Sequence, residues 1–122
     1  MADQLARPRA YLKHSCPYCL KLRIFLTEAG LADGFDFTIF EDGDATHEGL
    51  RAAMEAAGQK ASFPAVEFEA GRYETGTDAL IERLAGEAGV DVEALALLRY
   101  YEGGVFKRHV AMFRELQTLK GG

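Results

Sequence analysis

The sequence has few residues of the kinds that bind metal ions. Its 122 residues include only two cysteines and three histidines. Four-coordinate zinc needs four ligands, and the sequence contains no second C-x-x-C and no H-x-x-x-H pair to complete such a site. No metal is therefore expected. We interpret His47 as a surface residue and His109 as a packed or rim residue rather than as ligands.

Basic residues are also in short supply. The chain has 14 Lys and Arg against 19 Asp and Glu, which gives a formal net charge of −5. Proteins that bind nucleic acids present a basic face to the phosphates, so this charge argues against nucleic acid as the main partner. The acidity is sufficiently explained by its contribution to solubility.

Long apolar runs are absent from the sequence. No stretch approaches the roughly 20 residues that span a bilayer, which argues against a membrane partner. Residues 1–8 lack the apolar region of an export signal, so we expect a cytoplasmic protein. In a reducing compartment, paired cysteines are usually catalytic or metal-binding rather than structural. The hydrophobic content of 48% and the length are those of a chain that folds around one core.

The two cysteines lie in Cys16-Pro17-Tyr18-Cys19, between a predicted strand over residues 9–13 and a predicted helix over residues 20–30. Pro17 suits the first helical position, which places Cys16 at the N-cap. A thiolate there accepts hydrogen bonds from free N–H groups and is stabilised by the helix dipole, so its pKa should fall below about 8.5. We expect Cys16 to attack and Cys19 to resolve. A purely structural disulfide is disfavoured because its loop is so short.

The remaining pattern predicts an α/β fold. Residues 35–40 alternate as a strand, and a helix capped by Asp44 or Thr46 ends at Gly58. A hairpin is predicted over residues 62–74, and a third helix follows it and ends at Gly89. The order β-α-β-α-β-β-α fits a four-stranded mixed sheet with flanking helices, a first domain over residues 1–89. Lys21, Arg23 and Glu28 are expected to face water.

Residues 90–122 are predicted to form a helical extension. Asp91 can cap a first helix, and Gly103-Gly104 breaks the chain before a second helix. The second helix carries an apolar stripe made of Val105, His109, Met112, Phe113, Leu116 and Leu119. We expect this stripe to pack on the same domain, in a monomer; pairing with another chain in a homodimer is the alternative.

The chain resembles the glutaredoxin family over roughly residues 9–89. Residues 16–19 match the family's C-P-Y-C dithiol motif, and Lys13 matches a lysine that pairs with a carboxylate of glutathione. Ser62-Phe63-Pro64 stands where the family has T-V-P with a cis proline, and Gly76-Thr77-Asp78 matches its G-x-D turn. Two departures are the bulkier Phe63 and the presence of Thr75 in place of the first glycine of a common pair.

The resemblance implies a thioredoxin-like fold and a glutathione-dependent disulfide oxidoreductase, with glutathione as co-substrate and glutathionylated or disulfide-bonded proteins as partners. The glutathione-binding residues that it implies, with Tyr18 expected at the edge of the groove, are Lys13, Tyr18, Lys60, Phe63, Pro64, Gly76, Thr77 and Asp78. The sequence leaves open whether glutathione or a flavoprotein reductase is the electron donor.

Two other functions share these features. Glu74-Thr75 is similar to the Glu-Ser of glutathione transferase N-terminal domains, which share the fold, although only about thirty residues follow the third predicted helix. Alternatively, a glutaredoxin dimer can hold a [2Fe–2S] cluster on Cys16 and external glutathione, since thiolates bind such clusters. Pro17 disfavours the cluster because it stiffens the motif.

Overall fold

The computed structural model describes residues 4–120. Residues 1–3 of the first predicted domain and residues 121–122 of the predicted C-terminal extension lie outside it. The predicted order β-α-β-α-β-β-α is confirmed, and further helical segments follow it. The elements are β1 (Gln4–Lys13), α1 (Pro17–Glu28), a 3₁₀ turn (Ala32–Gly34), β2 (Asp36–Phe40), α2 (Ala45–Ala56), β3 (Ala65–Glu69), β4 (Arg72–Thr75), α3 (Thr77–Ala88), a second 3₁₀ turn (Val92–Ala94), α4 (Ala96–Gly103) and α5 (Val105–Leu119).

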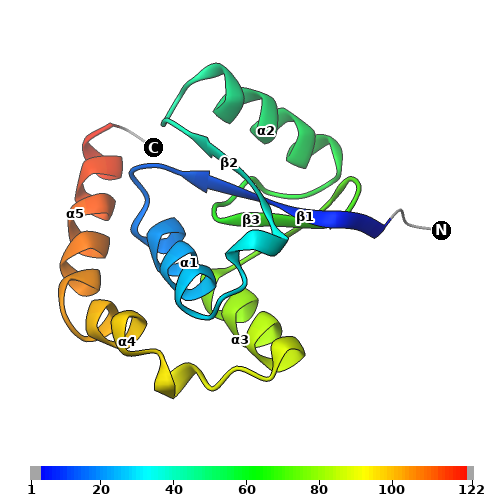
Figure 1. The fold of residues 1–122 in the computed structure, drawn as a ribbon. Helices are drawn as coiled ribbons and strands as arrows, with labels where there is room; N and C mark the ends of the chain where they lie inside the picture. Colours follow the sequence, from blue (N-terminus) through cyan, green and yellow to red (C-terminus); the bar gives the residue numbers. More distant parts are fainter. Residues whose placement is uncertain (1–3, 121–122) are drawn as a thin grey trace.

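The four strands form one mixed sheet in the order β2-β1-β3-β4 (Figure 1). β1 runs parallel to β2, with Leu12 opposite Ile39, and antiparallel to β3, with Ala10 opposite Val66. β3 and β4 form the predicted hairpin. β1 is longer than predicted, because Gln4 pairs with Glu69 beyond a shift in register. The thioredoxin-like fold class is therefore confirmed.

Side chains of β1 alternate between two hydrophobic cores, as expected for a strand buried on both faces. Ala10 and Leu12 belong to the larger core, which also contains residues of α1, α3 and α4. Tyr11 points to a smaller core with Met54 of α2. Figure 1 shows α2 on one side of the sheet and α1 and α3 on the other. The sheet thus lies between two helical layers, and the loop after β1 enters α1 at the carboxyl end of the strand.

Helix α4 receives its N-terminal cap from a distant residue. Its own N-cap position, Leu95, has no capping side chain. Instead, the Glu28 carboxylate at the end of α1 accepts hydrogen bonds from the backbone N–H groups of Leu97 (2.7 Å) and Leu98 (2.8 Å). These are donors that a helix start leaves without partners. Glu28, expected to face water, therefore joins the C-terminal segment to α1.

Lys21 is not on the water-facing side of α1 as predicted. Its side chain is buried, and its Nζ lies 2.9 Å from Asp78 Oδ1 and 3.3 Å from Glu102 Oε2. These two carboxylates raise the pKa of Lys21, although burial alone would lower it. The prediction was wrong because the helical pattern does not show that α3 and α4 bring carboxylates to this face.

The two C-terminal helices differ in burial. Leu98 of α4 is fully buried and belongs to the larger core, whereas α5 has no buried residue. Phe113 packs against the core, and the exposed members of the predicted stripe are Val105, Met112, Leu116 and Leu119. Among residues 4–120, no helix is long and apolar enough to cross a membrane.

Candidate active site

The dithiol lies where β1 leads into α1. Cys16 is the N-cap residue of α1, in an extended conformation, and Pro17 opens the helix as predicted. Both thiols are free and buried, with Cys16 4% exposed and Cys19 2% exposed. The backbone N–H of Lys13 donates to Cys19 Sγ at 3.3 Å. The Cys16 Sγ lies 4.0 Å from the Phe63 carbonyl oxygen, next to the cis Phe63–Pro64 bond that the resemblance implies.

The pKa values of the two cysteines are shifted in opposite directions. The pKa of Cys16 is lowered to about 7, chiefly by a hydrogen bond from the Cys19 thiol and against the effect of burial. The backbone N–H groups of Cys19 and Tyr18 and the charge of Lys13 lower it further. The pKa of Cys19 is raised by burial, by its hydrogen bond to Cys16 and by the negative charge of that thiolate. A large fraction of Cys16 is therefore thiolate at neutral pH, and the thiolate is the reactive form of a cysteine.

Alkylation of Cys16 by iodoacetamide should increase as the pH rises through about 7. The low pKa means that the thiolate is already half formed at that pH. A Lys13→Gln variant should move the midpoint upward, since the Lys13 charge stabilises the thiolate. Mass spectrometry of quenched samples would follow the reaction at this residue. A midpoint at or above the free value of about 8.5 would contradict the assigned acidity.

A cleft of about 620 Å³ opens beside Cys16. This is within the range of small-molecule sites, roughly 300–1,000 Å³. The residues expected from the resemblance that line it are Lys13, Tyr18, Phe63, Pro64, Gly76, Thr77 and Asp78. Lys60 is exposed and is not among the lining residues of the described chain. The structure therefore brings together all of the expected residues except Lys60.

The cation that sequence reasoning missed is Arg51 of α2, which lines the cleft together with His47. His47 is buried rather than on the surface as predicted. Its Nδ1 accepts the backbone N–H of Gly43 at 2.8 Å, and its ring packs on Phe63. Burial and the charges of Lys13 and Arg51 lower the pKa of His47. The one available sequence signal was the four-residue spacing of His47 and Arg51, which places them on one helix face.

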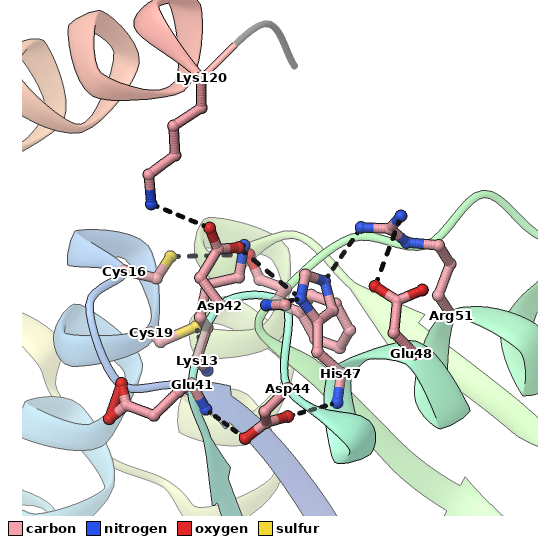
Figure 2. Close-up of polar contacts among 12 residues, drawn as sticks. Lys13, Cys16, Cys19, Glu41, Asp42, Asp44, His47, Glu48, Arg51 and Lys120 are labelled. Atoms are coloured by element: carbon pink, nitrogen blue, oxygen red, sulfur yellow. Dashed lines mark hydrogen bonds and ion pairs between the residues drawn. The ribbon is translucent and has the colours of Figure 1, made fainter.

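A carboxylate holds Lys13 at the cleft. Its Nζ lies 3.1 Å from Asp42 Oδ1, and Asp42 Oδ2 lies 3.1 Å from Nζ of Lys120 at the end of α5 (Figure 2). Hydrogen bonds from Lys13 and Lys120 lower the pKa of Asp42. Lys13 and Arg51 together place positive charge at a cleft in an otherwise acidic chain.

The start of α3 forms a further wall. Gly76 has a φ of 93°, a conformation that glycine adopts readily. The Thr77 hydroxyl donates to the Tyr18 carbonyl at 3.2 Å, and the Asp78 carboxylate pairs with Lys21. The free N–H groups of such a helix start favour an anion. Within residues 4–120, no group of three or more His, Cys, Asp or Glu is placed to hold a metal ion.

Comparisons with known proteins add one similarity. No family model matches the sequence, and no curated protein matches it. A solved structure that resembles it is the crystal structure of a glutathione transferase homolog from Sulfitobacter with bound glutathione, at 22% identity and a TM-score of 0.46. The similarity covers 82% of this chain and 50% of that one, so this chain spans about half the length of the transferase homolog.

Proposed function

We propose that the protein is a glutathione-dependent thiol–disulfide oxidoreductase of the glutaredoxin type. The observation that carries the proposal is the difference in pKa between the two thiols of the dithiol. Cys16 has a pKa of about 7 at a helix N-cap, and the buried Cys19 has a raised pKa. With such pKa values, one thiol is ionised and able to attack, and the other stays protonated until it acts as the resolving thiol. The free dithiol suits a reducing, cytoplasmic setting.

The reaction starts when the Cys16 thiolate attacks the glutathione sulfur of a glutathionylated substrate. A Cys16–glutathione disulfide forms, the substrate disulfide bond breaks, and the substrate sulfur leaves as a thiolate and takes up a proton. The thiolate of a second glutathione then attacks the glutathione sulfur bound to Cys16. Glutathione disulfide is released, and Cys16 returns as the thiolate.

Protein disulfides require Cys19. Cys16 attacks one sulfur of the substrate disulfide, the S–S bond breaks, and the other substrate sulfur leaves as a thiolate that takes up a proton. Cys16 then no longer carries the negative charge that, together with burial and the hydrogen bond between the thiols, raises the pKa of Cys19. Cys19 can then lose its proton and attack Cys16, which forms an intramolecular disulfide and releases the second substrate thiol. Two glutathione molecules reduce that disulfide to the starting dithiol and are released as glutathione disulfide.

The cleft residues fit glutathione, a peptide with two carboxylates and one amine. We assign Lys13 and Arg51 to one carboxylate, because both cations line the cleft. The N-terminal N–H groups of α3 would receive the γ-glutamyl carboxylate, with Asp78 near the amine. The Phe63 backbone would pair with the cysteinyl part. The chemistry that glutathione supplies is reduction by its thiol.

The decisive assay uses a glutathionylated peptide and compares electron sources. Glutathione with glutathione reductase should support turnover, whereas thioredoxin reductase should not. The reason is that the cations Lys13 and Arg51 line the cleft and attract a small anionic thiol. Arg51→Gln should raise the KM for glutathione about tenfold, in line with the loss of a charge-assisted hydrogen bond.

Lys60→Gln is the matched control, because Lys60 carries the same charge and is outside the cleft. It should leave the KM unchanged. Turnover with thioredoxin reductase but not with glutathione would refute the proposed donor. A higher KM in Lys60→Gln than in Arg51→Gln would refute the assignment of Arg51.

A glutathione transferase-like activity on electrophiles is the second candidate, and one observation favours it. Next to Cys16, an apolar groove lies between α1 and α5 and can accept an apolar electrophile. Such an enzyme would form a thioether between glutathione and the electrophile, in a reaction that needs no resolving thiol. Conjugation that survives Cys19→Ser, without any disulfide reduction, would identify this alternative.

A further inference from the structure

Helix α5 lines two cavities beside the thiol although none of its own residues is buried. Phe113 lines the glutathione cleft and also the apolar groove on its other side. The groove measures about 670 Å³, and its apolar lining consists of Pro17, Leu20, Met112, Phe113, Leu116 and Leu119. Cys16 lines both cavities as well. Phe113 therefore separates two cavities that meet at the thiol.

The Cys16 side chain offers little surface to a folded protein. Cys16 is 4% exposed, and a disulfide on a protein surface carries bulky chain on both sides. The cleft of about 620 Å³ has room for a molecule of glutathione's size. Helix α5 has no buried residue, whereas α1 and the sheet belong to the core, so movement of α5 would widen access to the thiol at the lowest cost.

Helix α5 is held beside the thiol by half-buried aromatic contacts and by polar contacts near the surface. Its Phe106 and Phe113 rings pack edge-on against Tyr18, and His109 pairs with the Tyr101 hydroxyl at 2.9 Å. Arg114 donates to the Tyr18 hydroxyl at 3.0 Å, and Lys120 pairs with Asp42 at 3.1 Å. The Lys13 ammonium lies 5.8 Å from the centre of the Phe113 ring. Lys120 is 49% exposed at its side chain, and exposed ion pairs contribute little and are screened by salt. None of these α5 side chains is itself buried, so α5 can move without exposing a fully buried side chain of its own.

A pair of glycines joins this helix to a fixed neighbour. Gly103 ends α4, and Gly104 has φ −114° and ψ −104°, where a Cβ would lie 3.1 Å from the Tyr100 carbonyl oxygen. Helix α4 is anchored by the fully buried Leu98. The junction therefore has the conformational freedom of a hinge between an anchored helix and an unburied one.

We propose that α5 is a substrate gate that determines which disulfides Cys16 reduces. With Lys120 on Asp42, glutathione-sized disulfides reach the thiol through the cleft. Release of that contact and rotation at Gly103–Gly104 joins the two cavities and admits protein disulfides. The role of the gate in substrate selection rests on the proposed reductase function, but the movement of α5 can be measured without catalysis.

The test compares alkylation of Cys16 by N-ethylmaleimide and by a maleimide on a 5-kDa-class polyethylene glycol, about the bulk of a small domain. A Cys19→Ser background leaves a single thiol, and the ratio of the two rates cancels the thiolate fraction. Lys120→Gln should raise the bulky-to-small ratio about two- to fivefold, the range for loss of one exposed ion pair. High salt should do the same to the parent protein.

Two further variants make the test specific. Arg108→Gln removes the same charge from an exposed α5 residue that has no hydrogen bond or ion pair within residues 4–120, and should leave the ratio unchanged. The methyl group added by Gly103→Ala would meet no atom within 4 Å. This variant should lower the ratio roughly threefold because alanine stiffens the hinge. Equal ratios in Lys120→Gln and Arg108→Gln, or a higher ratio in Gly103→Ala, would overturn the gate.

The catalytic arm uses Lys120→Gln with both cysteines present. Its kcat/KM for a protein disulfide should rise relative to that for a small glutathione mixed disulfide, by the same two- to fivefold or so. If the parent protein reduces neither substrate, the proposed function fails, and the alkylation ratios still decide whether α5 is a gate. An unchanged kcat/KM ratio in an active enzyme would refute the gate alone.

Discussion

Replacement of Cys16 by serine is expected to abolish reduction of both glutathione mixed disulfides and protein disulfides. The loss should be at least about a thousandfold, because a hydroxyl cannot replace the thiolate that forms the covalent intermediate. Cys19 cannot take over, since it is only 2% exposed and its burial raises its pKa even without the Cys16 thiolate. Initial rates with a glutathionylated peptide and with a disulfide-bonded protein measure both activities.

Cys19→Ser is the matched partner of this variant. It should retain most reduction of glutathione mixed disulfides, for which Cys16 and a second glutathione suffice. It should lose most reduction of protein disulfides, for which a resolving thiol is needed. In a Cys19→Ala variant, which has no side-chain donor, the pKa of Cys16 should rise, since the Cys19 thiol makes the largest contribution to lowering it. Equal losses in both variants and with both substrates would contradict the assigned roles.

Leu98→Ala is expected to lower the free energy of unfolding by about 2–5 kcal/mol, the usual range for a buried leucine. Leu98 is fully buried in the larger core, where α4 packs on α1. The adjacent Leu97→Ala is the control, because Leu97 is 55% exposed and its loss should change stability by less than about 0.5 kcal/mol. Denaturant unfolding of the two variants gives both values.

This comparison also tests the relation between the C-terminal helices and the first 89 residues. If α4 is part of the same cooperative unit, Leu98→Ala shifts the single unfolding transition of the whole chain. An unchanged main transition, with a separate change at low denaturant concentration, would mean that α4 unfolds independently. Equal effects of the two leucines would mean that the packing of α4 contributes little.

Local signals explain what the sequence predicted well. Pro17 and the spacing of the cysteines placed Cys16 at the start of α1, because capping depends on residues that are neighbours in the chain. Gly89 was expected to end the third helix, and it adopts the left-handed conformation there. Alternation within residues 35–40 and 62–74 indicated strands of the sheet.

The features that were missed depend on residues brought together by the fold. Lys21 and His47 each occupy a polar position in a helical pattern, and each is buried by another part of the chain. Arg51 lines the cleft because α2 packs on one face of the sheet, next to the segment before β3 that carries Phe63. Helical spacing alone cannot show these approaches, since the partners lie at long and irregular sequence separations.

The cap that Glu28 provides to α4 constrains the order in which the chain acquires its structure. Its hydrogen-bond partner Leu97 lies 69 positions further along the chain. During synthesis, α1 leaves the ribosome well before α4, so for that interval the Glu28 carboxylate has no N–H donors from α4. Contacts between such distant residues slow folding. Helix α1 is therefore expected to gain its last stabilising contacts only after nearly the whole polypeptide has emerged.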